Sequence, residues 1–203
     1  MLTLYDSKLS GNGWKVRILL NLLGRTYERK VLDLGAGQAR TPEFLKLNPW
    51  ARVPVLVLED GTALAESNAI LMFLARGTPW LPDDPVQQAL VVKWLFFEQA
   101  DHLRFFARPR FLVALAGLGE QCADEVAYLR EIGARALPAL QAQLASTPFI
   151  AGDNCTIADI ALFPYTSMAG MGGYDLQPYP AILAWIDRMR ALPGFIELIP
   201  PQA

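Results

Sequence analysis

The sequence predicts a two-domain protein in which a small α/β domain precedes an all-helical domain. Short segments with strand-like and helix-like spacing alternate through residues 1–77, whereas residues 86–203 show only helical periodicity. Residues 78–85 carry three prolines and are expected to form a linker between the domains. A chain of 203 residues is long enough to bury the cores of two such domains.

The first domain is expected to begin with a strand–helix–strand unit. Strands are predicted over residues 2–5 and 27–32. Between them, apolar residues from Val16 to Leu23 recur at i, i+3, i+4 and i+7, which indicates one buried helix face, and Gly24 is expected to end that helix. A right-handed crossover of this kind makes the two strands parallel.

The rest of the first domain is expected to hold a short helical turn, a hairpin and a last helix. The short turn is predicted near residues 42–47. Asp60-Gly61 is a strong hairpin signal, so segments 55–58 and 62–65 should pair antiparallel. With the helix that begins at Ser67, the predicted order is β-α-β-α-β-β-α.

The second domain is predicted to consist of helices alone. Thr156 and Asp159 have the spacing of a capping box, and Asp159 is expected to be a buried structural group. Prolines mark the start of one expected helix and the kinks expected in two others. The expected helices cover about 85–106, continuing past a kink at Pro109 toward 116, then 121–144 with a kink at Pro138, a helix from 158, and 180–190.

Composition argues against several classes of function. The net charge is −2 without a basic block, which argues against a nucleic-acid partner. The N-terminus lacks a signal-peptide pattern and no apolar stretch is long enough to cross a bilayer, so a cytoplasmic protein is expected. Cys122 and Cys155 are expected to be reduced, and a single histidine excludes an ordinary histidine-cluster metal site. The 53% of apolar residues is a surplus compatible with a subunit interface.

Two segments of the first domain predict a site for an acidic, peptide-like ligand. In Val53-Pro54 the proline removes an N–H that the following strand would use. The neighbouring main chain is then left for another partner, at a turn with a cis peptide bond. Ser67 is placed as the N-cap of the last helix, where its hydroxyl and the adjacent N–H groups attract an anion.

Three motifs, in the same order along the chain, resemble those of the cytosolic glutathione S-transferases. They are Asn-Pro-x-x-x-Val-Pro-x-Leu over residues 48–56, Glu-Ser-x-x-Ile over 66–70 and a capping-box segment over 149–159. The resemblance spans almost the whole chain. It implies a thioredoxin-like domain that holds glutathione, an all-α C-terminal domain, and the serine-type active site of many bacterial relatives.

The resemblance places the chemistry at the junction of the first strand and first helix. Glutathione's thiol has a pKa of about 8.5, so only roughly 3% is thiolate at neutral pH, and a helix N-terminus with a hydroxyl donor favours the anion. Ser10 is the first candidate for that donor; the alternative interpretation is that it only caps the helix. Asn12 and Tyr5 are the alternatives. Gly13 stands where some relatives carry cysteine, which argues against mixed-disulfide chemistry.

The resemblance also implies the remaining contacts to glutathione. The Val53 main chain would pair with the cysteinyl unit, and Arg52 would bind the glycyl carboxylate or remain solvated. Ser67 would hold the γ-glutamyl carboxylate, with Glu66 near its amino group. In the long helix of the second domain, Asp101-His102 would face the cleft or a second subunit, or form a solvated pair.

Together these residues imply a cytoplasmic, homodimeric glutathione transferase without a metal, which joins glutathione to small apolar electrophiles. A glutathione-dependent peroxidase, isomerase or lyase is the alternative on the same site. A regulatory relative that has lost turnover is the alternative outside catalysis. The apolar pocket for the electrophile has no directional signature in the sequence.

Overall fold

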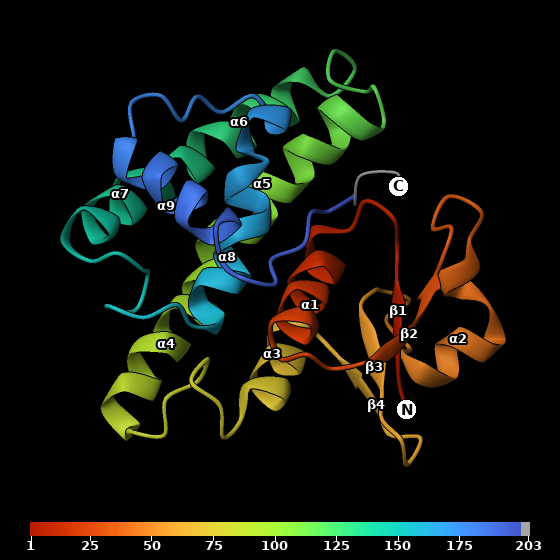
Figure 1. The fold of residues 1–203 in the computed structure, drawn as a ribbon. Coiled ribbons are helices and arrows are strands. Elements are labelled where there is room, and N and C mark those ends of the chain that lie inside the picture. The colour runs from red at the N-terminus through yellow and green to blue at the C-terminus, as the bar shows by residue number, and fades with distance from the viewer. Residues whose placement is uncertain (200–203) are drawn as a thin grey trace. The chain divides into compact units, whose positions relative to one another are not determined.

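The structure is a computed structural model that describes residues 1–199. The chain forms two compact units (Figure 1). The first contains residues 1–76 together with the segment that starts at Pro193, and the second contains residues 77–192. The sequence prediction instead includes that last segment in the helical domain.

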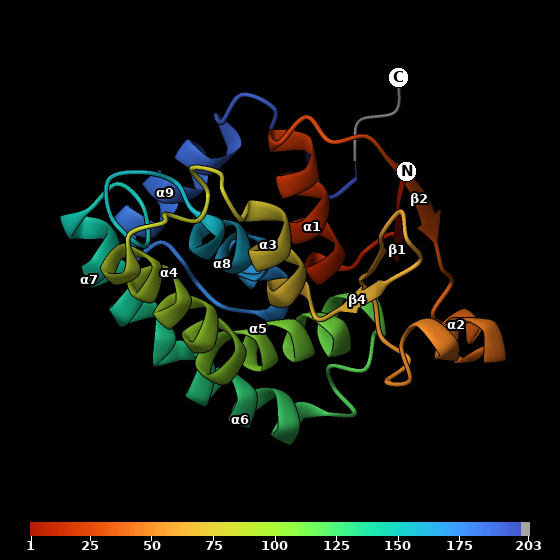
Figure 2. The ribbon, with the colours of Figure 1, turned by 90° about the horizontal axis from the view of Figure 1, so that it is seen from below.

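The first unit has the predicted element order, that of a thioredoxin-like domain. Its sheet has the strand order β2-β1-β3-β4, in which β1 and β2 are parallel and the other pairs antiparallel. Helices α1 and α3 cover one face of the sheet and α2 covers the other (Figures 1 and 2). The elements are β1 (Leu2–Asp6), α1 (Gly11–Leu22), β2 (Tyr27–Val31), α2 (Pro42–Leu47), β3 (Val55–Val57), β4 (Ala63–Ala65) and α3 (Ser67–Ala75).

Local sequence signals account for the turns of this unit. The apolar stripe of α1 is buried, and Gly24 follows the helix with a φ of +61°, a conformation that glycine adopts without a Cβ penalty. Asp60-Gly61 makes the predicted hairpin turn, in which the Asp60 carboxylate accepts a hydrogen bond from the Thr62 N–H at 2.9 Å. Both predictions are confirmed.

The second unit is helical, and α8 lies at its centre with almost every residue buried (Figure 2). A continuous helical segment opens the unit, because π-helical turns at Glu98–His102 and Phe111–Leu115 follow α4 and α5 without a break. The α-helices are α4 (Pro85–Phe97), α5 (Leu103–Arg110), α6 (Ala123–Ala134), α7 (Ala136–Ser146), α8 (Ile157–Ser167) and α9 (Pro180–Arg190).

One predicted helix of this unit is wrong. The segment expected as a single helix with a kink at Pro138 is two helices that meet at Arg135. Pro138 therefore lies in the first turn of α7, where no intrahelical partner is required for its missing N–H. The proline ends the helix before it instead of bending a continuous one.

The capping box at the start of α8 is confirmed and extends into a larger network. The buried Asp159 carboxylate accepts the N–H of Thr156 at 2.9 Å and the N–H of Ile150 at 2.8 Å. It also accepts the indole N–H of Trp185 in α9 at 2.9 Å. Burial raises the pKa of Asp159 to about 6. One carboxylate thus joins α8, α9 and the preceding loop.

The segment after Pro193 belongs to the first unit because side chains of α1 bind its main chain. The Trp14 indole N–H donates to the Ile196 carbonyl at 2.7 Å, and the Asn21 amide to Gly194 at 2.6 Å. Arg17 donates to the Leu198 carbonyl at 2.9 Å. The segment runs beside α1 in Figure 1. Main-chain carbonyl acceptors leave no pattern in a sequence, which explains why the prediction assigned this segment differently.

We predict that Asp159→Ala lowers the free energy of unfolding by more than about 3 kcal/mol, because it leaves several buried donors without an acceptor. Urea denaturation measures this. Asp153→Ala is the matched control, since Asp153 is exposed in the same loop and its loss should cost less than about 0.5 kcal/mol. Equal effects of the two variants would contradict a structural role for Asp159.

Candidate functional site

The strand register gathers three of the predicted segments at one end of the sheet. Tyr5 pairs with Val55, and Val55 pairs with Ala65, so these three residues lie side by side across β1, β3 and β4. Just beyond this row lie the loop that enters α1, the Val53-Pro54 turn and the start of α3. The site is therefore assembled from segments that are far apart in the sequence.

Ser10 is the N-cap of α1. Its hydroxyl oxygen accepts a hydrogen bond from the Gly13 N–H at 3.0 Å, and the side chain is only half-buried. The cap uses the oxygen as an acceptor and leaves the hydroxyl hydrogen to be donated. Within residues 1–199 that hydrogen has no acceptor. The capping interpretation of Ser10 is thus confirmed, and the geometry leaves its donor capacity for a ligand at the helix N-terminus.

The two alternatives to Ser10 differ in their surroundings. The Asn12 side chain is half-buried, and its Oδ1 atom is buried without a hydrogen-bond partner in the described part of the chain. The Tyr5 ring packs edge-on against Phe44 with 5.8 Å between ring centroids, and Lys30 lies over it. Tyr5 therefore has the packing role expected for a strand residue.

The turn before β3 presents main-chain groups. The Val53–Pro54 peptide bond is cis, as expected. Among residues 1–199 the N–H and C=O of Val53 have no hydrogen-bond partner, whereas the Arg52 carbonyl accepts the Asn48 amide at 2.9 Å. The Arg52 side chain is exposed. The main chain of Val53 is thus left for an external partner.

The placement of Ser67 as N-cap of α3 is wrong. Glu66 occupies the cap position, with a φ of +67° that is unusual for a residue with a side chain, and its carboxylate makes no capping hydrogen bond. Ser67 is the first residue of the helix. Its buried hydroxyl receives a contact from the Lys15 ammonium at 3.5 Å, and its N–H has no partner in the described chain. The start of α3 still combines a free N–H with positive charge, which suits a carboxylate.

Asp101 and His102 are not a pair on one surface. Asp101 is exposed, whereas His102 is fully buried inside the helical unit. The His102 ring stacks on Phe106 at 4.2 Å, and its Nε2 atom lies 2.9 Å from the Thr166 hydroxyl. Both the cleft role and the solvated-pair interpretation are thus wrong for His102. A π-helical turn at this position rotates neighbouring residues away from the spacing that an α-helix predicts.

The site also contains charged residues that the sequence analysis did not single out. Asp6 at the end of β1 is fully buried and pairs with Arg17 of α1 at 3.0 Å and Arg29 of β2 at 2.8 Å. Burial raises the pKa of Asp6, although both arginines oppose this rise. Lys15 is likewise buried in α1. The sequence does contain a signal for them, because Lys15 and Arg17 are the charged residues of the otherwise apolar stretch 14–20.

A metal site, a membrane span and a reactive thiol each have structural requirements, which can be compared with residues 1–199. No group of three or more histidine, cysteine, aspartate or glutamate side chains is arranged to hold a metal there, and none of the described helices is long and apolar enough to span a membrane. Cys122 and Cys155 are both free thiols. The Cys155 sulfur lies 3.5 Å from that of Met189, and burial raises the pKa of its thiol, which disfavours the reactive thiolate.

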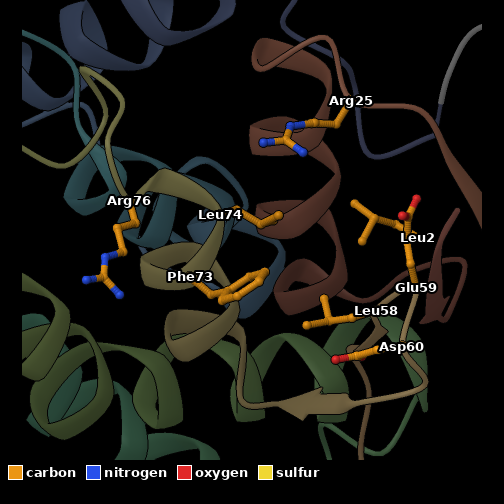
Figure 3. A pocket seen from close by; sticks show the side chains of 8 residues that line it. All are labelled: Leu2, Arg25, Leu58, Glu59, Asp60, Phe73, Leu74 and Arg76. Carbon is orange, nitrogen blue, oxygen red and sulfur yellow. The ribbon is translucent and has the colours of Figure 1, made fainter.

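A pocket of about 460 Å³ lies elsewhere on the first unit (Figure 3). It is found beside the hairpin turn and the C-terminal ends of α1 and α3, and none of the predicted site residues lines it. The Glu59 carboxylate at its edge pairs with the Met1 amino group at 2.9 Å. The pocket is lined by Leu2, Arg25, Leu58, Glu59, Asp60, Phe73, Leu74 and Arg76. It is separate from the candidate site, which lies at the N-terminal ends of the same helices.

Two protein-family models match this chain. The family model of the glutathione S-transferase N-terminal domain matches residues 9–76, and that of the C-terminal domain matches residues 91–193. The chain belongs to the glutathione S-transferase family.

Individual relatives show how similar the chain is to known members. A crystal structure of a glutathione S-transferase from Pseudomonas fluorescens Pf-5 has a TM-score of 0.95 and 42% sequence identity, covering 98% of each chain. The transcriptional regulator URE2 of Saccharomyces cerevisiae is 30% identical over 97% of this chain and 67% of its own length. A structure of Ure2p in complex with glutathione has a TM-score of 0.86 and 27% identity, covering 95% of this chain and 91% of the other.

Proposed function

We propose that this chain is a glutathione transferase that binds glutathione at the end of the sheet marked by Tyr5, Val55 and Ala65. The observation that supports this best is the convergence there of three sets of hydrogen-bonding groups that have no partner among residues 1–199. These are the hydroxyl hydrogen of Ser10, the main chain of Val53 and the N–H at the start of α3. A tripeptide with a thiol, a main chain and a carboxylate matches these three groups.

Each part of glutathione then has a partner of suitable chemistry. The Val53 main chain pairs with the cysteinyl unit. Ser67 and the α3 N-terminus, with Lys15 nearby, hold the γ-glutamyl carboxylate, and Glu66 binds its amino group. The exposed Arg52 is available for the glycyl carboxylate. The glutathione-bound Ure2p structure, which shares this fold, supports the proposal.

Ser10 is proposed to activate the thiol, with Asn12 as the alternative donor. Lowering the thiol pKa by about 2 requires roughly 2.7 kcal/mol of differential binding of the thiolate and makes most of the bound thiol reactive near neutral pH. A hydroxyl donor and the N-terminus of the 12-residue helix α1 act in the same direction. The thiolate then attacks a soft electrophilic carbon of a small apolar substrate; with an aryl halide, the C–S bond forms and the carbon–halogen bond breaks, so that halide leaves.

A regulatory function is the second candidate, because URE2 of S. cerevisiae is a transcriptional regulator. A peroxidase, isomerase or lyase would use the same thiolate on a different substrate. Retention on immobilised glutathione, followed by assays with an aryl halide and an organic hydroperoxide, separates these functions. Retention without turnover of either substrate would favour the regulator.

The proposed assembly is a cytoplasmic homodimer. Large apolar side chains are exposed on each unit, including Trp50 at 62% and Phe96 at 72%. Aromatic side chains are enriched at protein–protein interfaces relative to the rest of the surface.

We predict a dimer of about twice the 22.4 kDa chain mass in sedimentation equilibrium at micromolar concentration. Asp101 would then be available for a contact across the subunits. A single species at the chain mass would contradict both statements.

We predict that Ser67→Ala weakens glutathione binding roughly ten- to a hundred-fold. It removes a hydroxyl contact to a carboxylate, worth about 1.5–3 kcal/mol. Calorimetric titration measures the affinity. Ser146→Ala, an exposed substitution at the end of α7, should leave it unchanged. Wild-type affinity combined with a lower melting temperature would limit Ser67 to a structural role.

We predict that Ser10→Ala leaves glutathione affinity nearly intact but raises the pKa of the bound thiol. Conjugation near neutral pH should fall by about one to two orders of magnitude, and the defect should shrink toward about pH 9, where the thiolate forms unaided. Ultraviolet titration of the thiolate and the pH profile of the rate test this.

The control for Ser10→Ala is Thr41→Ala, because Thr41 caps α2 in the same way by accepting the Phe44 N–H at 3.3 Å. Its loss should cost similar stability, about 1 kcal/mol, without a change in rate. The prediction is contradicted if Ser10→Ala leaves the conjugation rate and the thiol pKa unchanged. If Asn12→Ala or Tyr5→Phe then lowers the rate and raises the thiol pKa, the catalytic role belongs to Asn12 or Tyr5.

A further inference from the structure

The buried carboxylate of Asp6 connects β1 to the loop that carries Ser10. Its Oδ1 atom accepts the Ser7 N–H at 2.6 Å, at the start of that loop. Its Oδ2 atom lies 3.0 Å from Arg17 Nε and receives two hydrogen bonds from Arg29, at 2.8 and 3.1 Å. Among residues 1–199, the charged and titratable groups that interact with it are Arg17, Arg29 and Tyr27.

Gly13 provides a second connection between Asp6 and Ser10. A Cβ atom at this position would overlap the Asp6 carboxylate, whose Oδ1 atom fills the space that a side chain would occupy. On its other side, the Gly13 N–H donates to the Ser10 hydroxyl oxygen at 3.0 Å. Glycine inside a helix costs roughly 1 kcal/mol relative to alanine, so its presence in the first turn of α1 fits a steric requirement.

We propose that Asp6 is a positioning residue for the thiol site, holding the loop before α1 and the first helical turn so that the Ser10 hydroxyl points at the glutathione sulfur. This inference rests on the function proposed above. Asp6 does not contact the substrate in this proposal. It acts through Ser7 and Gly13, the residues on either side of the Ser10 cap.

The charges of Asp6, Arg17 and Arg29 make the proposal testable, because each possible role of Asp6 predicts a different effect on the pKa of the bound thiol. A carboxylate near a forming thiolate disfavours it, and Arg17 and Arg29 offset that charge. If Asp6 acted only by its charge, its removal would lower the pKa of the bound thiol. If it acts by positioning Ser10, its removal raises that pKa. A purely structural ion pair predicts no change in the folded protein.

Asp6→Asn and Gly13→Ala are the two test variants. The first removes the charge, and the second displaces the carboxylate while leaving Asp6 in the chain. In both variants we expect the pKa of bound glutathione to rise by about 1, with conjugation about threefold slower at pH 7 and recovering at high pH. The affinity for glutathione should remain within about threefold, because its other contacts are intact.

A double variant and a control sharpen the result. Because both substitutions act on one contact, the double variant should be no slower than about twice the worse single variant. Asp60→Asn, on the exposed hairpin turn of the same unit, should leave rate and thiol pKa unchanged. If Asp6→Asn does not fold, the thiol pKa of Gly13→Ala tests the positioning role of Asp6 by itself.

The outcomes separate this inference from the proposed function. The first outcome is a thiol pKa that is lowered in the wild type and rises in Ser10→Ala, but stays the same or falls in the two test variants. This outcome overturns the role of Asp6 and leaves the proposed function standing. A wild-type protein whose bound thiol titrates like free glutathione overturns the proposed function and the inference with it. A rise in both test variants, with retained affinity, supports the positioning role.

Discussion

The register between β1, β3 and β4 determines which parts of this chain meet. Leu4 pairs with Leu56, and both are fully buried, so a shift of one residue would turn these side chains out of the core. The same pairing aligns Tyr5, Val55 and Ala65 and thereby brings the start of α1, the Val53-Pro54 turn and the start of α3 together. The free energy of core packing therefore also fixes the geometry of the candidate site.

Features encoded by neighbouring residues were predictable from the sequence. The hairpin at Asp60-Gly61, the helix end at Gly24 and the capping box of Asp159 each depend on contacts within a few residues. Ser10 was predictable for the same reason, since a serine before a helix is a local signal.

Features that depend on distant partners were not predictable in this way. The N-cap of α3 is Glu66 instead of the predicted Ser67, and Glu66 adopts a positive φ. No residue pattern in the sequence predicts that conformation. The burial of His102 depends on Phe106 and on Thr166 of another helix. In the sequence, Asp6 and Arg17 cannot be distinguished from ordinary surface charges. Their pairing depends on the packing of β1 against α1. The sequence thus indicated the segments of the site better than the contacts within it.

The binding of the C-terminal segment to α1 makes the first unit discontinuous along the chain. Arg17 contacts both Asp6 and the Leu198 carbonyl, so a group beside the candidate site is held by nearly the last described residue. During synthesis, residues 1–76 leave the ribosome long before this partner exists. The sheet can form early, as N-terminal domains commonly do, but the surroundings of Arg17 are completed only after the whole helical unit has been made. The order of translation therefore places the completion of the site after the synthesis of the helical unit.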